Sequence, residues 1–198
     1  MIVDRYSKRQ QQIIEAAINL IASDGIQKLS IRNLTRNIGI TEPALYRHFD
    51  SKQDLLIEIL NYFEETGKVI NDEICTIYER PLECIEKFLL LKLENLSRNP
   101  ALASVIFSEE IFRYDGRLSK KVQDIMRKNR DFIEKLVITG QETGEVRSDI
   151  PGDQISMIIL GTIRLLVKRW RLSDFSFNLE DEGRRLKDTI IGLISEGK

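Results

Sequence analysis

Residues 41–52 carry side chains whose types and spacing suit contact with the bases of DNA. Arg47 can donate two hydrogen bonds to guanine O6 and N7, and Glu42 can accept one from cytosine N4. Pro43 and Ala44 can touch the methyl group of thymine. These groups read a base sequence only when one helix presents them together, so the elements around them decide whether this chemistry is available.

Three short helices are predicted at the start of the chain. Ser7 and Gln10 form the pattern of a capping box, and the apolar residues that follow recur at spacings of three and four. Ser30 is a good N-cap for a second helix and Thr41 for a third, and Gly39 allows a tight turn between them. Two helices joined in this way are the helix-turn-helix pattern, whose second helix enters the major groove.

The third helix is predicted to be amphipathic. Leu45 and Phe49 would face inward and anchor it. The side chains left on the opposite side are Thr41, Glu42, Tyr46, Arg47 and His48.

Three stretches of the N-terminal quarter of the chain then match one family at fixed spacing. They read IIEAAINLIASDG (13–25), LSIRNLTRNIGITEPALYRHF (29–49) and SKQDLL (51–56). This segment resembles the N-terminal DNA-binding domain of the TetR (tetracycline-repressor) family of bacterial transcription regulators. The resemblance implies a DNA-binding domain over residues 1–50, with its motif at about 30–49, and a helical effector-binding and dimerisation domain over 51–198.

The resemblance also implies a role for each exposed side chain. Tyr46, His48 and Lys52, with the backbone amides that begin the second and fourth helices, would hold phosphates while the third helix reads bases. The position of Arg47 is often aromatic in the family, and this departure indicates a different operator. The predicted DNA-binding residues are Ser30, Arg32, Thr41, Glu42, Pro43, Ala44, Tyr46, Arg47, His48 and Lys52.

Simpler roles stay open for several of these residues. His48 taken alone is compatible with packing, and Tyr46 with a place in the core. Arg32 and Arg36 face either solvent or phosphate, and the sequence does not separate the two. Residues 1–52 carry a net charge of +3 and the remainder −4, which favours a polyanionic partner but is a difference that chance also produces.

The composition excludes several classes of protein. Leu, Ile, Val and Phe make up a third of the 198 residues, so the chain can bury a core. One His and two Cys make neither a standard zinc site nor a disulfide framework, and no nucleophile elbow, phosphate loop or HExxH motif occurs. No apolar run approaches the ~18 residues of a membrane span, and the N-terminus lacks a signal peptide. We therefore expect a cytoplasmic protein that is not an enzyme, does not enter a membrane, and needs neither cofactor nor metal.

Helical patterns continue to the C-terminus, so the predicted fold is all-α. Helices are expected from Ser51 to Ile77 or Tyr78, from Pro81 past Leu96, from Pro100 to Phe107 or Phe112, from Arg117 to Thr143, from an Asp153 cap to Arg171, and from Leu179 to Ser195.

The last two of these helices are apolar on more than one face and need more than one partner. The resemblance implies that they pair with their twins in a homodimer, as a four-helix bundle; the simpler alternative is that they only close the core of one chain. A dimer would place two recognition helices on a pseudo-palindrome. The predicted interface residues are Ile155, Ile159, Thr162, Leu166, Leu179, Gly183, Leu186, Ile190 and Leu193.

The body of the protein is expected to enclose a small-molecule effector. Candidate lining residues are Phe88, Phe107, Phe112, Met126, Met157, Arg164 and Trp170, although core packing is the favoured explanation for each apolar one taken alone. Arg164 lies in an otherwise uncharged segment and needs an anionic effector, a Glu or solvent as its partner.

These predictions lead to a sequence-specific DNA-binding transcriptional regulator. Its expected form is a ligand-responsive repressor that acts as a homodimer on a palindromic operator, with double-stranded DNA and an unidentified small-molecule effector as partners. The alternative is a DNA-binding architectural or regulatory protein whose C-terminal domain docks a protein partner instead.

Overall fold

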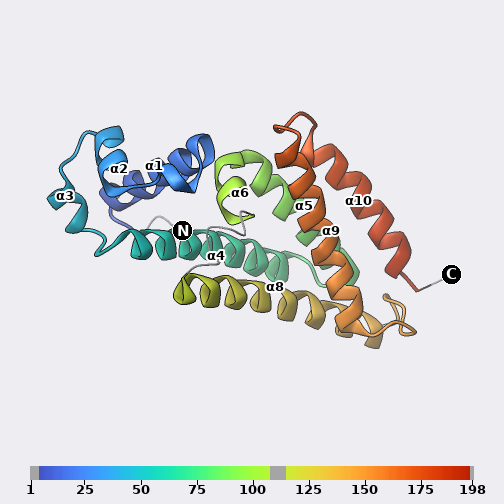
Figure 1. Ribbon diagram of the computed structural model, residues 1–198. Coiled ribbons are helices and arrows are strands. Elements are labelled where there is room, and N and C mark those ends of the chain that lie inside the picture. Colours follow the sequence, from blue (N-terminus) through green and yellow to red (C-terminus); the bar gives the residue numbers. More distant parts are fainter. Residues whose placement is uncertain (1–4, 108–114, 197–198) are drawn as a thin grey trace. The chain divides into compact units, whose positions relative to one another are not determined.

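The computed structural model describes residues 5–107 and 115–196, and within these ranges the chain is helical apart from its connections and one isolated β-bridge (Figure 1). This confirms the predicted all-α fold. The predicted continuation toward Phe112 lies outside the described residues. The elements are α1 (Lys8–Asp24), the short 3₁₀ turn η2 (Ile26–Lys28), α2 (Ile31–Ile38), α3 (Glu42–Tyr46), α4 (Lys52–Ile77), α5 (Pro81–Arg98), α6 (Pro100–Ile106), α8 (Gly116–Glu142), α9 (Gly152–Leu172) and α10 (Leu179–Ile194).

The chain divides into two compact units that alternate along the sequence. The first contains the residues up to Thr66 and residues 99–123, and the second contains residues 67–98 and those from Asp124 onward. The helices α4 and α8 each contribute to both units. This division differs from the predicted boundary at residues 50/51, because the first half of α4 belongs with the N-terminal helices, as does α6, which packs on α1.

Local hydrogen bonds define the start of the first unit. Ser7 Oγ accepts from the Gln10 amide at 3.2 Å, and Gln10 Oε1 accepts from the Ser7 amide at 3.0 Å, which confirms the predicted capping box. The buried face of α1 includes Ile13 and Ala17, and the helix contacts α2 and α6. The helix-turn-helix therefore rests on a packed apolar support.

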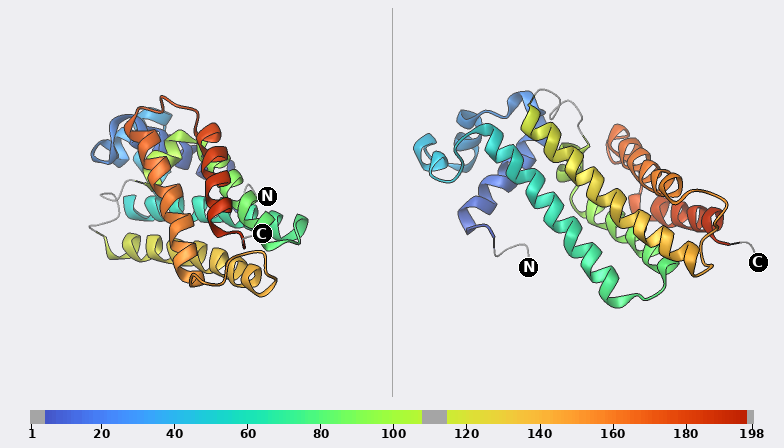
Figure 2. Two further views of the ribbon diagram at one scale, coloured as in Figure 1. Left: turned by 90° about the vertical axis from the view of Figure 1, so that its right-hand side faces the viewer. Right: turned by 90° about the horizontal axis from the view of Figure 1, so that it is seen from below.

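In the second unit α10 packs along both α5 and α9 (Figure 2). The two helices α10 and α5 approach each other closely at Gly183, where an added Cβ would lie 2.7 Å from Leu93 Cδ1. The connection that follows α8 is fastened to the end of α10, because the Arg147 amide donates to Ile194 O at 2.8 Å. Both helices that were predicted to dimerise are therefore also part of this unit's own core.

The start of α9 differs from the prediction. Pro151 precedes the helix without a side-chain cap, and Asp153 lies in the first turn, where its charge still favours the helix dipole. The side-chain cap is found on the next helix instead. Asn178 Oδ1 accepts from the amides of Glu180 at 2.9 Å and Asp181 at 3.1 Å, which satisfies two donors that α10 would otherwise leave unpaired.

Candidate nucleic-acid interface

The turn between α2 and α3 has the geometry that a helix-turn-helix needs. Gly39 ends α2 in the left-handed region (φ 67°, ψ 37°), where a residue with a Cβ would be strained. Thr41 begins α3, and its Oγ1 accepts from the Ala44 amide at 3.3 Å. Leu34 of α2 and Leu45 of α3 are both fully buried, so the two helices share one core. Their relative orientation follows from this shared core and the glycine turn.

The outer face of α3 presents the side chains that the sequence predicts. Tyr46 is 46% exposed, which excludes the alternative that it is a core aromatic. The half-buried pair Ala44 and His48 lies between this face and the core, so the packing alternative for His48 stays open. The other exposed side chains on this face are Thr41, Glu42, Pro43 and Arg47.

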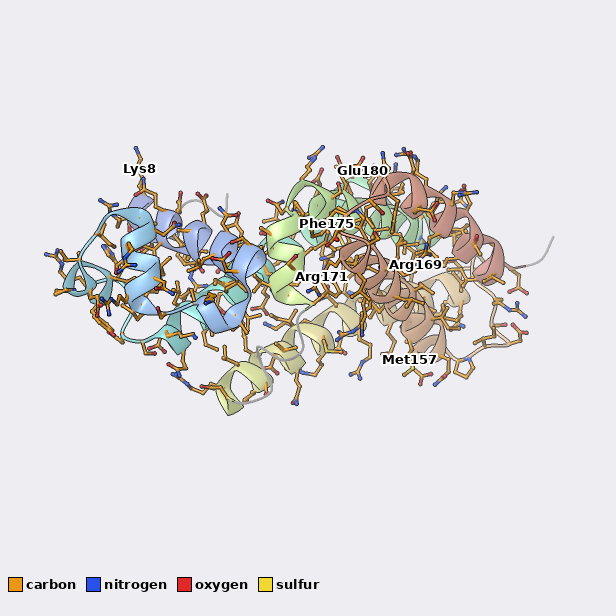
Figure 3. The ribbon with its side chains drawn as sticks, turned by 45° about the horizontal axis from the view of Figure 1, so that its top comes forward. Lys8, Met157, Arg169, Arg171, Phe175 and Glu180 are labelled. Atoms are coloured by element: carbon orange, nitrogen blue, oxygen red, sulfur yellow. The ribbon has the colours of Figure 1, made fainter. Side chains whose placement is uncertain are left out.

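Basic side chains flank this face. Arg32, Arg36 and Arg47 are exposed, and none of them forms an ion pair with any residue in the described ranges. On α1 the side chain of Lys8 projects away from the helix (Figure 3). Lys52 is half-buried, and burial lowers the pKa of its ammonium group. Unpaired guanidinium groups beside a recognition helix are suited to hold phosphate oxygens.

Polar contacts also stabilise the starts of α2 and α4. Ser30 Oγ accepts from the Asn33 amide at 3.1 Å, and Ser51 Oγ accepts from the Asp54 amide at the same distance. Ser51 Oγ also donates to Asp54 Oδ2 at 2.6 Å, and Arg117 of α8 lies 3.0 Å from Asp54 Oδ1. These two contacts, the serine hydrogen bond first, lower the pKa of the Asp54 carboxyl. The start of α4 is therefore joined within the first unit to the start of α8.

Two of the predicted effector residues pack in the core of the second unit. Phe88 is buried in the second unit, with its ring 5.7 Å from that of Phe132 on α8. Trp170 is also buried, and its Nε1 donates to Phe177 O at 2.9 Å. Both contacts belong to core packing. The remaining candidates are Phe107, half-buried where α6 ends; Arg164, half-buried on α9; Met126 and Met157, which are exposed; and Phe112, which lies outside the described residues.

The structure corrects the prediction that Met126 and Met157 line an effector pocket. Met126 is 52% exposed and Met157 is 63% exposed, and the Met157 side chain projects outward from α9 (Figure 3). Side chains with this much exposure do not line an enclosed cavity of a single chain. The helical spacing alone could not separate an outward from an inward methionine, because α9 carries apolar residues on both faces.

Most of the predicted interface residues lie inside the subunit. Buried among them are Ile155, Ile159, Leu166, Leu179, Gly183 and Ile190, so these side chains leave little surface for a partner. Thr162, Leu166 and Leu186 border an open groove between α9 and α10, and Leu193 is exposed. The exposed apolar side chains of α9 form a different row, which consists of Met157, Ile158, Leu165 and Leu172.

Sequence reasoning missed this exposed row and also missed Lys92 of α5. The row contains Ile158, Leu165 and Leu172 at intervals of seven residues, which would have identified a single helical stripe. Lys92 interrupts the apolar run FLLLKL (88–93). A single charged residue in such a run could have indicated a buried lysine.

Neither a metal site nor a membrane span is found in the described ranges. These residues contain no group of three or more side chains that could hold a metal ion. No helix in the same ranges is long and apolar enough to cross a bilayer.

Comparison with known proteins agrees with the geometry of this interface. Residues 13–59 match the family model described as bacterial regulatory proteins of the tetR family, and residues 61–197 match the model of the YsiA-like protein C-terminal region. The chain belongs to the TetR family. This TetR-family protein is therefore a DNA-binding transcriptional regulator, as the sequence predicts.

Individual relatives match all or part of this TetR-family protein. It is 23% identical over 195 residues to the fatty acid metabolism regulator protein of Bacillus subtilis, covering 96% of this chain and 95% of the relative. It is 28% identical over 126 residues to the nucleoid occlusion factor SlmA of Edwardsiella ictaluri, covering 61% of each. The solved structure of FadR from Bacillus subtilis in complex with stearoyl-CoA superposes with a TM-score of 0.77 at 21% identity, covering 95% of this chain and 98% of that one.

Proposed function

We propose that the protein is a repressor that binds a two-fold symmetric operator as a homodimer and leaves it when a long-chain fatty acyl compound binds to the second unit. It acts by binding and not by catalysis. The observation that carries the DNA-binding part is the outer face of α3, where Tyr46 and Arg47 are exposed without an ion pair in the described ranges. An unpaired arginine on a recognition helix is poised to read guanine.

The exposed row on α9 supports the homodimer. Ile158, Leu165 and Leu172 are 46%, 61% and 78% exposed, and their seven-residue spacing places them on one side of the helix. Gly161 lies on the same helix with nothing within 4 Å of an added Cβ, so the helix surface there is open to a close neighbour. A continuous apolar stripe of this kind is unfavourable in water and marks an interface.

The match of residues 61–197 to the YsiA-like C-terminal model supports an effector-binding second unit, and one curated relative that covers most of that region is named for fatty acid metabolism. The fold also resembles that of FadR from Bacillus subtilis, which was solved in complex with stearoyl-CoA. This likeness agrees with the proposal that the second unit binds an acyl chain. We propose an acyl thioester with coenzyme A as the first compound to test.

Selection from random duplex DNA at about 150 mM salt tests the DNA-binding part. The expected result is enrichment of one two-fold symmetric motif, followed by its release when palmitoyl-CoA is added. Retention of all sequences alike, with loss as salt rises, would contradict a sequence-specific repressor.

The homodimer is tested by sedimentation of Leu165→Glu against the control Ile77→Glu. Ile77 is 57% exposed at the end of α4, so its substitution adds the same charge at a similar exposure outside the row on α9. Leu165→Glu is expected to sediment as a monomer and to lose operator binding, while the control stays dimeric. If both variants sediment as dimers, the dimer interface does not include the exposed row on α9.

A protein-docking role is the second candidate, and the likeness to the nucleoid occlusion factor is the observation that favours it. Under that role, DNA binding would be sequence-specific but would not respond to palmitoyl-CoA. The release experiment therefore separates the two candidates.

A further inference from the structure

Lys92 of α5 directs its ammonium group into the interior of the second unit. Its Nζ donates to the backbone oxygen of Gly67 on α4 at 3.2 Å and lies 5.2 Å from the centre of the Phe88 ring. Gly67 makes this approach possible, because an added Cβ would lie 2.8 Å from that nitrogen. The lysine thus reaches the backbone of α4 at the point where the second unit begins.

No carboxylate in the described ranges neutralises this ammonium. Burial disfavours the charged form and lowers the pKa of Lys92 to about 8. An ammonium has three N–H donors, and the one hydrogen bond to Gly67 O together with the contact to the Phe88 ring leaves at least one of them for a ligand. A buried cation without an anionic partner is unfavourable, so it is expected where a ligand supplies the missing oxygen.

Asn71 provides a second, independent observation at the same place. Its Oδ1 is shielded from solvent and accepts no hydrogen bond in the described part of the chain. Asn71 lies one turn after Gly67 on α4, and side chains on a helix lean toward the preceding turn. The spacing therefore places Asn71 on the side of α4 that Lys92 approaches at Gly67.

We infer that Lys92 and Asn71 bind the polar end of the acyl effector. The acyl carbonyl oxygen accepts from Lys92, an N–H of the effector donates to Asn71 Oδ1, and the acyl chain lies against the apolar side chains around Phe88. This inference rests on the proposed function, since it names the contact that recognises the acyl compound. The surroundings of the two polar groups are apolar, because Ile74, Phe88 and Leu89 are all buried. These side chains pack in the core of the ligand-free protein, so the inference requires that they move apart when the chain binds.

Two sources can supply an acyl carbonyl, and Asn71 distinguishes them. The carboxylate of a free fatty acid offers only acceptors, so it satisfies Lys92 but not Asn71 Oδ1. The thioester of coenzyme A offers a carbonyl oxygen together with the nearby N–H of the pantetheine arm. The thioester therefore fits both groups, and the free acid fits one of them.

Calorimetric titration of the full-length protein with palmitoyl-CoA, palmitate and coenzyme A alone tests the inference. Lys92→Met is expected to weaken the binding of both acyl probes by about 10- to 100-fold, the effect of losing a hydrogen bond to a charged group. Asn71→Ala is expected to weaken only palmitoyl-CoA. The matched control is Lys87→Met, because Lys87 is on the same helix with its Nζ also 5.2 Å from an aromatic ring, that of Tyr78.

A spectroscopic readout separates binding from a structural role. In protein with ¹³C-labelled lysine, the Cε signal that disappears in Lys92→Met belongs to Lys92. Its titration midpoint is expected to rise when palmitate binds, because a nearby carboxylate stabilises the ammonium form. Lys92→Gln provides a second variant if Lys92→Met does not fold.

The outcomes distinguish this inference from the proposed function. If palmitoyl-CoA releases wild-type protein from DNA while Lys92→Met binds it equally well, the inference is overturned and the proposed function stands. If palmitate moves the Lys92 signal but no acyl probe affects DNA binding, the site stands and the proposed effector response fails. If neither probe binds the wild-type protein, both are overturned.

Discussion

Replacing Lys92 by Met is expected to stabilise the ligand-free protein at neutral pH. Burial lowers the pKa of this lysine from 10.5 to about 8, and each pKa unit corresponds to ~1.4 kcal/mol, so keeping the ammonium charged in the folded state costs up to ~3 kcal/mol. Methionine retains a long apolar side chain and removes this cost, but it loses the hydrogen bond to Gly67 O, which contributes about 1 kcal/mol. The expected net gain is about 1–2 kcal/mol at pH 7.

The same cause predicts how the gain depends on pH. Between about pH 8 and 10.5 the unfolded chain still holds the proton on Lys92, while the folded protein has begun to lose it. The unfolded state then binds more protons, so the stability of the wild-type protein rises with pH through this window. The advantage of Lys92→Met is therefore full below pH 8 and disappears as the pH approaches 10.5.

Urea unfolding at pH 7.0 and pH 9.5 provides the assay, with the fluorescence of Trp170 as its probe. Trp170 is the single tryptophan of the chain and is 5% exposed, so its signal reports on the second unit. Subtracting wild-type from variant stability cancels the other groups that titrate in this range. Lys87→Met is the matched control, because it removes an amine from the same helix. A variant less stable than wild type at pH 7.0, or an advantage that is the same at both pH values, would refute the reasoning.

Two further comparisons test the recognition helix and the packing of the second unit. Arg47→Ala is expected to cost ~1–3 kcal/mol at one base position and to relax preference there, whereas Lys52→Ala should weaken binding to all sequences alike; equal losses on every DNA for both variants would remove the base-reading role. In α10, Gly183→Ala is expected to be less stable than Gly192→Ala by ~1–3 kcal/mol in urea unfolding, because its Cβ would lie 2.7 Å from Leu93 Cδ1 while nothing lies within 4 Å at Gly192. Both substitutions gain the same helix preference, so equal stabilities would show that the close contact relaxes without cost.

The N-terminal helices were predictable because their ends are set by neighbours in the sequence. The Ser7 capping box and the Thr41 cap each satisfy a backbone donor within three residues, so the residue types alone define them. The exposed face of α3 follows in the same way from the positions of Leu45 and Phe49, both of which are buried. Local hydrogen bonding and helical periodicity are properties that a sequence carries directly.

The second unit was less predictable because its helices have several apolar faces. Ile155 and Ile159 have the spacing of an interface, yet both are fully buried in the subunit, and the row that contains Leu165 faces outward. Periodicity identifies a stripe, but it does not say which of two stripes meets the core of the same chain. Which stripe is buried depends on the packing of α9 against α5 and α10. The helix α5 is distant from α9 in the sequence, and α10 follows α9 after a short connection.

The sequence by itself determined the all-α fold, the helix-turn-helix and the residues that α3 presents, because each depends on residues a few positions apart. Only the tertiary structure decided which apolar face of α9 is free and that Lys92 reaches Gly67 without an acidic partner in the described ranges. Both of these depend on the packing of helices far apart in the chain. The burial of a charge or of a stripe is a property of the assembled core, which no single helix contains.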